Sequence, residues 1–244
     1  MIIEGLKTNV LIMGQGKDAV VLLHGWGGSS FSMLGLGNDL CAKYKVIIPD
    51  LWGFGKSEDP PHTFDVFDYA LGVIKIIKQL NLKQVHIIGH SFGGRLGIII
   101  ASLYPQYLKK LVLIDSAGLK PKFSIIKYLK IKRYKHLKKQ VLLGKKDEKC
   151  LLKFGSKDFL SLNNTLKEVF VRVVNQHLNN LLKDITTKTL ILWGKKDKDT
   201  PIYMAKVLHK NIKSSKLKLL NGGHFAYLFW QDLTLSYIYN FLED

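Results

Sequence analysis

The sequence predicts an α/β fold in which a mostly parallel sheet is covered by helices on both faces. Short apolar runs of strand length alternate with segments of helical apolar spacing along most of the 244 residues. Several of the runs are apolar throughout, as strands buried on both faces are, and they end in glycine-rich loops. A single lysine-rich segment breaks this alternation, and it predicts an inserted cap.

Eight strands are expected, and the first two form a hairpin over residues 1–4 and 8–13. The third, residues 19–23, is the unbroken apolar run Ala-Val-Val-Leu-Leu. The other strands are expected at residues 46–48, 85–88, 111–114, 189–193 and 217–220, and helices at residues 31–43, 66–80, 95–101, 202–210 and 233–242.

The domain prediction is a core made of residues 1–118 and 186–244, with residues 119–185 inserted after the sixth strand as a helical basic cap. Residues 119–188 hold 18 Lys or Arg against 5 Asp or Glu, so this segment carries +13 of the formal net charge of +18. Such a field attracts an acidic protein, an anionic substrate, nucleic acid or a membrane surface, or it is a solvated face without a partner. The segment lacks zinc-finger spacing and aromatic RNA-binding motifs, so no specific nucleic acid is expected.

The remaining composition indicates a soluble cytoplasmic protein. Cys41 and Cys150 are too few for a disulfide framework or a Cys-x-x-Cys metal site. The amino-terminal residues lack the order of a signal peptide, and no apolar run approaches the length of a transmembrane helix. No cluster of His, Cys, Asp and Glu has metal-ligand spacing, so neither a metal nor another cofactor is expected.

A candidate nucleophile stands between the fifth strand and the helix after it. Residues 89–93, Gly-His-Ser-Phe-Gly, match the G-x-S-x-G pattern, in which a strained strand-to-helix turn presents the serine. Gly89 and Gly93 remove the side chains that would block the close approach of strand and helix. Because a serine hydroxyl is a weak nucleophile, Ser91 requires a histidine base and an acid that orients the base.

The later strands supply both groups in the expected chain order. Asp197 follows the strand at residues 189–193, and His224 follows the last strand. Asp199 and Asp115 are rivals for the acid, and Asp197 is favoured because it completes a Gly-x-x-Asp loop. Upstream, residues 24–28, His-Gly-Trp-Gly-Gly, form a loop suited to expose backbone N–H groups to an oxyanion.

Taken together, these motifs resemble those of the α/β-hydrolase superfamily. The resemblance covers the chain outside the cap, and it implies that Ser91 is the nucleophile, His224 the general base and acid, and Asp197 the orienting acid. It also implies an oxyanion hole made of the backbone N–H groups of Trp26 and Phe92. The motifs that carry it are residues 24–28, 50–57 (Asp-Leu-Trp-Gly-Phe-Gly-Lys-Ser), 89–94, 192–197 with Pro201, and 222–225 (Gly-Gly-His-Phe).

The resemblance is strongest to small capped serine esterases, including those that act on acyl-carrier-protein methyl esters, and to C–C bond hydrolases of ring-fission products. It implies a carboxylesterase that cleaves a small acyl ester without a cofactor. The alternatives are a C–C bond hydrolase or a thioesterase on the same scaffold, and, in another class, a hydrolase fold that binds a ligand without catalysis. A basic cap also suits docking of an acidic carrier protein.

Other side chains are candidates for substrate contact or for packing. His24 is expected to brace the loop at residues 24–28, whereas His90 has no evident partner. Aromatic residues beside the motifs either line a substrate pocket or belong to the core. The substrate-binding candidates are Trp52, Phe54, Phe225, and Arg172 of the cap, whose guanidinium suits a carboxylate.

Overall fold

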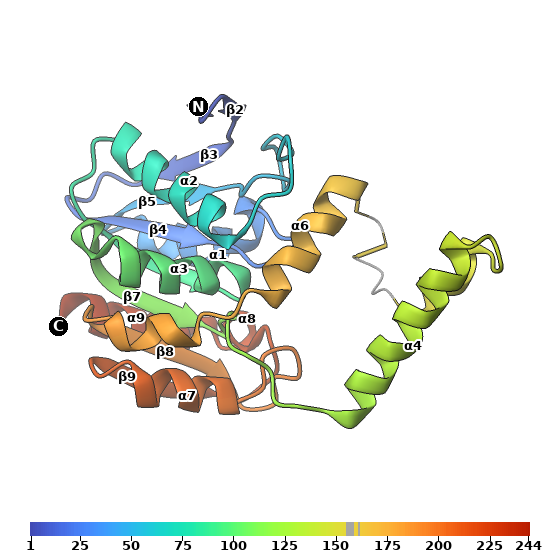
Figure 1. Cartoon of the computed structure of the whole chain (residues 1–244). Helices are drawn as coiled ribbons and strands as arrows, with labels where there is room; N and C mark the ends of the chain where they lie inside the picture. The colour runs from blue at the N-terminus through green and yellow to red at the C-terminus, as the bar shows by residue number, and fades with distance from the viewer. Residues whose placement is uncertain (155–158, 161) are drawn as a thin grey trace.

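The computed structural model describes residues 1–154, 159, 160 and 162–244 of the chain. It confirms the predicted α/β architecture: a twisted sheet lies between two layers of helices, and a further group of helices projects beyond one end of the sheet (Figure 1).

The central sheet has seven strands in the order β3-β5-β4-β6-β7-β8-β9. Strand β3 runs antiparallel to β5, and all the other neighbours are parallel. Every residue of β4 and β6 is buried, as an apolar strand between two helical layers must be. The strands are β3 (Val10–Met13), β4 (Ala19–Leu23), β5 (Lys45–Pro49), β6 (Val85–His90), β7 (Leu108–Ile114), β8 (Thr189–Gly194) and β9 (Ser215–Leu220).

The prediction of eight strands in the sheet is wrong by one. The amino-terminal residues form a separate pair, in which β1 (Ile2–Ile3) and β2 (Leu6–Lys7) run antiparallel across a turn at Gly5. Only β3 joins the large sheet. The reason lies in the turn at Glu4 and Gly5, which both have positive φ. This tight turn pairs β1 with β2, so β3 is free to pair with β5.

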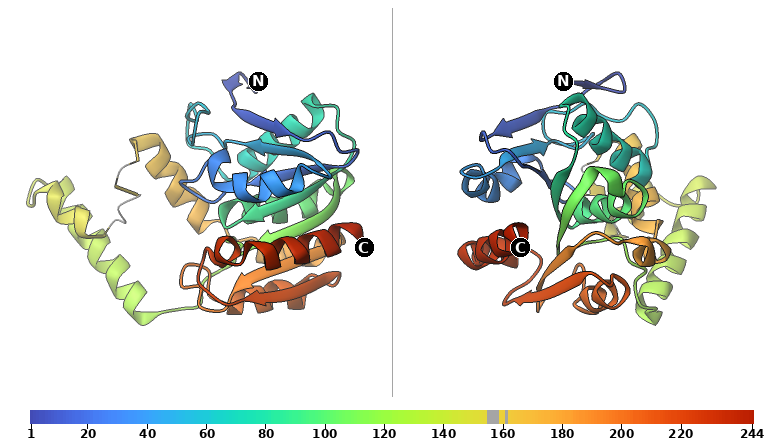
Figure 2. Two further views of the ribbon diagram at one scale, coloured as in Figure 1. Left: turned by 180° about the vertical axis from the view of Figure 1, so that it is seen from behind. Right: turned by 90° about the vertical axis from the view of Figure 1, so that its left-hand side faces the viewer.

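The two faces of the sheet are covered by different helices (Figure 2). Val21 and Leu23 of β4 pack with α2, α3 and α7, whereas Val20 and Leu22 pack with α1 and α9 on the opposite face. This split follows from the alternation of side chains along a strand. The helices are α1 (Leu34–Leu40), which follows the short helix η1 (Ser30–Met33), α2 (Val66–Gln79), α3 (Phe92–Leu103), α7 (Tyr203–Asn211), α8 (Ala226–Phe229) and α9 (Gln231–Glu243), and η2 (Pro105–Tyr107) precedes β7.

The named elements of the basic segment between β7 and β8 are all helices, joined by loops. Its elements are α4 (Ile125–Leu142), η3 (Glu148–Phe154), α6 (Asn164–Asn175) and η4 (Asn179–Asp184). Helix α4 stands away from the sheet and packs with η3, while α6 lies between α4 and the core (Figure 1). None of the described helices is long and apolar enough to cross a membrane.

Helix α6 is anchored to the core by apolar side chains and by one buried cation. Val169 and Val173 are buried. The Arg95 guanidinium on α3 donates hydrogen bonds to the carbonyl oxygens of Val173 and Gln176, the second at 2.6 Å. Burial lowers the pKa of Arg95 to about 10. Arg95 is therefore a structural residue that ties the cap to the helix after the elbow.

Candidate active site

Ser91 occupies a strained turn between β6 and α3. Its backbone has φ of 51° and ψ of −107°, a conformation that non-glycine residues rarely adopt. The Ser91 N–H donates to Ile114 O at 3.0 Å, which fixes the turn against β7. A Cβ on Gly89 would lie 2.4 Å from Gly93 O, and a Cβ on Gly93 would lie 2.2 Å from Leu23 O. The glycines of the motif therefore allow the backbone contacts that the turn requires.

His224 and Asp197 meet beyond the ends of the last two strands. His224 Nδ1 lies 2.8 Å from Asp197 Oδ2, with the histidine side chain 12% exposed and the aspartate side chain fully buried. Burial acts to raise the pKa of Asp197, but hydrogen bonds from His224 and Thr200 outweigh it and lower that pKa to about 2. Asp197 is thus a carboxylate at neutral pH, able to hold a proton on His224 Nδ1.

Thr200 is a supporting residue that the sequence analysis did not identify. Its hydroxyl lies 2.7 Å from Asp197 Oδ2, and its backbone N–H donates to Asp197 Oδ1 at 3.0 Å. The Asp199 N–H donates to the same Oδ1 at 2.8 Å. Asp199 therefore supports Asp197 through its backbone, while its side chain is exposed. The spacing of Thr200 three residues after an aspartate is the signal of a side-chain-capped turn, which could have identified it.

Asp115, the other rival, is buried beside Asp197 in a different protonation state. Its side chain is fully buried, Oδ1 accepts from the Gly194 N–H at 2.7 Å, and Oδ2 has no hydrogen-bond partner among the described residues. Burial and the Asp197 carboxylate raise the pKa of Asp115 to about 8. Two neighbouring acids with pKa values pushed so far apart have different roles, and only Asp197 contacts His224.

His90 positions the loop that carries His224. Its Nε2 lies 2.9 Å from His224 O, and the two rings are 4.8 Å apart. Burial lowers the pKa of His90 to about 3, so the ring is neutral and Nε2–H donates to that carbonyl. Because Ser91 is the next residue in the chain, this bond places the His224 loop beside the elbow. Across the described residues, no hydrogen bond joins Ser91 Oγ to His224.

The glycine-rich loop after β4 runs past the elbow. A Cβ on Gly25 would lie 3.4 Å from Ser91 Cβ. In the described part of the chain, neither the Trp26 N–H nor the Phe92 N–H donates to a protein acceptor. His24 braces this loop as expected, since Nε2 accepts from the Leu51 N–H at 3.0 Å and Nδ1 lies 2.7 Å from Gly25 O. Two free donors beside Ser91 suit a developing oxyanion.

The four predicted substrate-binding residues divide into two groups. Trp52 is a core residue, because it is 5% exposed, packs against Tyr69 and donates its indole N–H to Thr8 Oγ1. Phe54 is also buried, although its ring contacts Trp26 at 4.9 Å. Trp52 thus packs in the core, and its contact with substrate stays a prediction.

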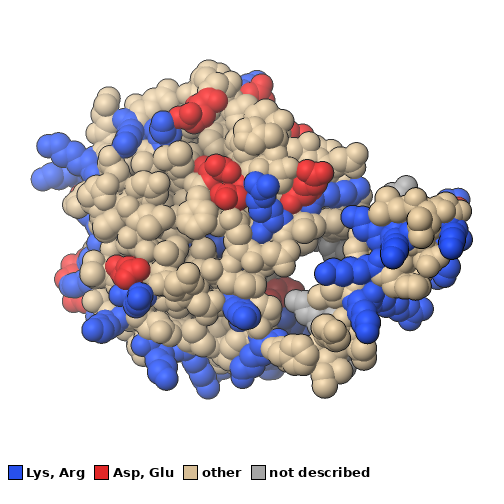
Figure 3. Space-filling view, viewed as in Figure 1, with Lys and Arg blue, Asp and Glu red and all other residues tan. Residues whose placement is uncertain are grey.

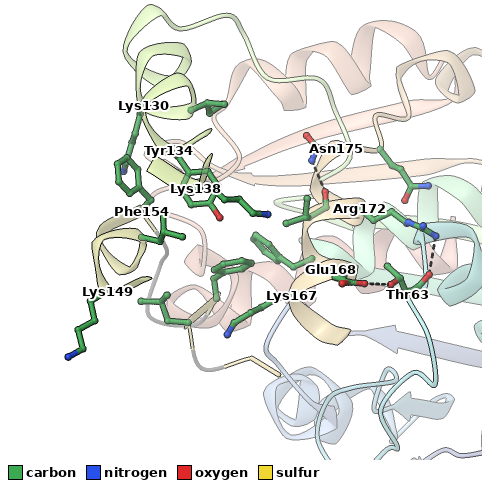
Figure 4. A pocket seen from close by; sticks show the side chains of 17 residues that line it. Thr63, Lys130, Tyr134, Lys138, Lys149, Phe154, Lys167, Glu168, Arg172 and Asn175 are labelled. Carbon is green, nitrogen blue, oxygen red and sulfur yellow. Dashed lines mark hydrogen bonds between the residues drawn. The ribbon is translucent and has the colours of Figure 1, made fainter. Parts of the chain in front are cut away.

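The other two candidates are accessible. Phe225 is 51% exposed, and its ring contacts those of His90, at a tilt, and His224, edge to face. Arg172 is exposed on α6, where its Nη1 donates to Thr63 O at 3.0 Å. Phe225 therefore stands at the candidate site, and Arg172 lies in a cleft of the cap (Figure 4).

One group of side chains has the proximity of metal ligands. Asp197, Asp199 and His224 each have a ligand atom within 4.8 Å of the others. The carboxylate oxygens of Asp197 already accept hydrogen bonds from His224, Thr200 and the Asp199 N–H. This bonding describes an oriented acid–histidine pair, and it leaves Asp197 no unsatisfied lone pair aimed at a cation.

Comparison with known proteins bears on the family and the fold of the chain. The family described as alpha/beta hydrolase fold matches residues 18–138. The chain is 27% identical to a 2-hydroxy-6-oxononadienedioate/2-hydroxy-6-oxononatrienedioate hydrolase of Escherichia coli K12, with 94% of this chain and 88% of that protein covered.

Two solved structures share the fold over nearly the whole chain. A hydrolase from Pseudomonas aeruginosa superposes with a TM-score of 0.79 at 19% identity, covering 99% of this chain and 96% of that one. An esterase from Exiguobacterium antarcticum gives a TM-score of 0.78 at 23% identity, with 100% and 98% covered.

Proposed function

Because the chain belongs to the alpha/beta hydrolase superfamily, we propose that it is a serine hydrolase that cleaves an acyl ester through Ser91, His224 and Asp197. The observation that carries the proposal is the 2.8 Å contact between His224 Nδ1 and a fully buried Asp197 carboxylate, beside a serine on a strained elbow. A buried carboxylate that holds the Nδ1 proton of a histidine is the arrangement that a catalytic base requires.

The proposed reaction has two stages. Ser91 Oγ attacks the ester carbonyl carbon while His224 Nε2 removes the hydroxyl proton. The tetrahedral intermediate then collapses, its C–O bond to the alcohol breaks, and His224 returns the proton to the leaving alkoxide. Water attacks the resulting acyl-Ser91 in the same way, with His224 again as the base. The products are a carboxylic acid, an alcohol and free enzyme.

Asp197 and the two backbone donors support these steps without forming bonds to the substrate carbon. Asp197 keeps the Nδ1 proton in place, so Nε2 is the nitrogen that faces the nucleophile. The N–H groups of Trp26 and Phe92 stabilise the oxyanion as it forms. One donor of this kind contributes about 2.7–4 kcal/mol to transition-state stabilisation.

A fluorophosphonate probe tests the nucleophile directly. We expect covalent labelling of the folded wild type and complete loss of labelling in Ser91→Ala. The matched control Ser102→Ala, near the end of α3, should leave labelling unchanged. Hydrolysis of p-nitrophenyl esters of increasing chain length should show a length optimum that Ser91→Ala abolishes. If the folded wild type neither reacts with the probe nor hydrolyses any ester, the ester hydrolase proposal is wrong.

A second candidate function is hydrolysis of a C–C bond, and the named activity of the Escherichia coli relative favours it. The substrate in that name carries a 6-oxo group, a ketone, and hydrolysis of a ketone breaks a carbon–carbon bond. The loss of absorbance of a 2-hydroxy-6-oxo-dienoate, measured in parallel with the ester panel, distinguishes the two. Faster turnover of the dienoate than of the esters would assign the site to C–C cleavage. Turnover of a series of thioesters, measured in the same way, tests the third bond type.

A further inference from the structure

The cap contains a cleft that the proposed reaction does not explain. It lies between α4, η3 and α6 and has a volume of about 1460 Å³. It is lined by residues of these three elements together with Thr63, Phe159, Leu160 and Gln176 (Figure 4). Pockets for drug-sized ligands typically measure about 300–1,000 Å³. Neither Ser91 nor His224 is among the described lining residues. The cleft is therefore a separate space large enough for an extended ligand.

Positive charge surrounds this cleft. The cations are Lys130 and Lys138 from α4, Lys149 from η3, and Lys167 and Arg172 from α6. Figure 4 shows Lys138 and Lys167 directed toward the space between α4 and α6 from opposite walls, whereas Lys149 points outward. Figure 3 shows that lysines also dominate the visible face of the projecting helices.

Among the side chains that the structure describes, little negative charge balances these cations. Glu168 is the acid among the lining residues, and its carboxylate accepts a hydrogen bond from Thr63 Oγ1 at 2.7 Å. Among the residues that the structure describes, none of the four cleft lysines forms an ion pair. Like charges that face one another across a cavity repel. An anion between them would remove that repulsion.

Apolar rings form the other part of the lining and lead toward the elbow. Phe159 and Phe170 have ring centroids 5.4 Å apart, and Phe170 lies 5.1 Å from Trp26. Trp26 in turn lies 5.3 Å from Phe92, the residue after Ser91. We call these four residues the aromatic row. Phe159, Phe170 and Trp26 are each only partly buried, so the row offers apolar surface to a ligand.

We propose that the cleft binds the anionic end of a single-chain amphiphile, whose apolar chain follows the aromatic row to Ser91. The ligand class is a long acyl chain that ends in a phosphate or a carboxylate. Binding in the cleft stands on the charges and rings described above, whereas cleavage of such a ligand rests on the proposed ester hydrolysis. The same chemistry has two sources, a free amphiphile or an acyl chain on the phosphate-containing arm of an acidic carrier protein.

A binding experiment tests the cleft without using catalysis. Dodecyl phosphate, kept below its micelle concentration, is titrated into the whole protein by calorimetry, with uncharged dodecyl glucoside as the comparison. We expect the phosphate to bind more tightly, and Lys138→Glu/Lys167→Glu to weaken it by about tenfold, since two partly exposed attractions become repulsions. The matched control is Lys210→Glu/Lys213→Glu, which changes the net charge equally at the far end of the sheet and should have no effect.

A kinetic experiment connects the cleft to Ser91. The p-nitrophenyl ester of decanoic acid is compared with the mono-p-nitrophenyl ester of decanedioic acid, which has the same chain and a terminal carboxylate. We expect a lower KM for the anionic ester, and a rise in that KM alone in Lys138→Glu/Lys167→Glu, with kcat unchanged. If Ser91→Ala abolishes turnover but the anionic and the uncharged ester have equal KM values, this inference is overturned. The ester hydrolase proposal would remain intact.

The final arm identifies the source of the ligand. The same acyl chain is presented on a carrier protein with its phosphopantetheine arm, and its cleft-dependent affinity is compared with that of dodecyl phosphate. Tighter binding of the carrier-borne chain assigns the cleft to a carrier, and equal binding assigns it to a free amphiphile. Equal affinity of dodecyl phosphate and dodecyl glucoside, or equal loss of affinity in the two double variants, would contradict the proposal.

Discussion

Helices α3 and α4 differ in composition and in burial, and they serve the molecule in opposite ways. The first ten residues of α3, from Phe92 to Ala101, are all buried, and its glycines allow close contact with β6 and β4. Helix α4 has basic residues on every side and no acidic residue, and its described side chains are exposed or half-buried. The comparison shows that the two helices have different roles. The tight packing of α3 holds the reacting groups in place, whereas the exposed charges of α4 are available to recognise a ligand.

The largest expected effect concerns the two acidic side chains near the carboxyl end of β8. Asp197→Asn should lower kcat for ester hydrolysis by about 10⁴-fold, because an amide does not hold the Nδ1 proton of His224 in place. Asp199→Asn, two residues later, should retain near-wild-type kcat, since Asp199 contacts Asp197 through its backbone N–H. Steady-state kinetics measure both. Equal losses of kcat in the two variants would mean that any substitution in this loop impairs catalysis. The assignment of Asp197 as the acid that orients His224 would then lose its support.

Glycines test how closely each region is packed. Gly93→Ala should reduce the free energy of unfolding by about 3 kcal/mol or more, because the new Cβ would meet the backbone of Leu23. Gly144→Ala, in the loop after α4, has open space around it and a φ of 68°, so its cost should be about 1 kcal/mol. Urea unfolding measures both. A larger cost at Gly144 would show that the cap is packed more tightly than the core.

The same contrast explains which features the sequence could predict. Ser91, Asp197 and His224 were predicted because each belongs to a short motif that ends a strand, so local backbone geometry encodes its position. The contact of His90 with His224 depends on how two distant loops meet after folding, and no local pattern reports that. The contacts of Thr200 lie within one loop, where the Asp-x-x-Thr spacing is the only local signal. Trp52 carries the same aromatic signal whether it lies in the core or in a pocket, and only tertiary packing decides between them.

Asp115 offers a test of the packed region through pH. Its folded pKa of about 8 lies above the ordinary value of 3.8, so the folded protein holds this proton while the unfolded chain has lost it. Stability should therefore fall as pH rises between these values, by at most about 1.4 kcal/mol per pH unit for this group. Asp115→Asn removes the dependence.

The measurement is the free energy of unfolding of wild type and Asp115→Asn from about pH 5 to about pH 8. The difference between them should grow with pH in favour of the asparagine variant. Asp184→Asn, an exposed acid at the end of η4, is the control and should track the wild type. A constant difference across the range would mean that Asp115 is ionised throughout, and its assignment as a neutral partner of Asp197 would be wrong.

The smallest effect is expected on the apolar side chains of α4. Leu129 is 56% exposed, so Leu129→Ala should change the free energy of unfolding by no more than about 0.5 kcal/mol. Leu182→Ala, at a buried leucine of η4 that is 1% exposed, should cost about 2–5 kcal/mol in the same assay. A cost above about 1 kcal/mol at Leu129 would show that α4 buries this side chain in solution. The measurement is then repeated with saturating dodecyl phosphate, which should raise the free energy of unfolding if it binds the cleft. Leu129→Ala should leave this gain unchanged, whereas Lys138→Glu/Lys167→Glu should remove it.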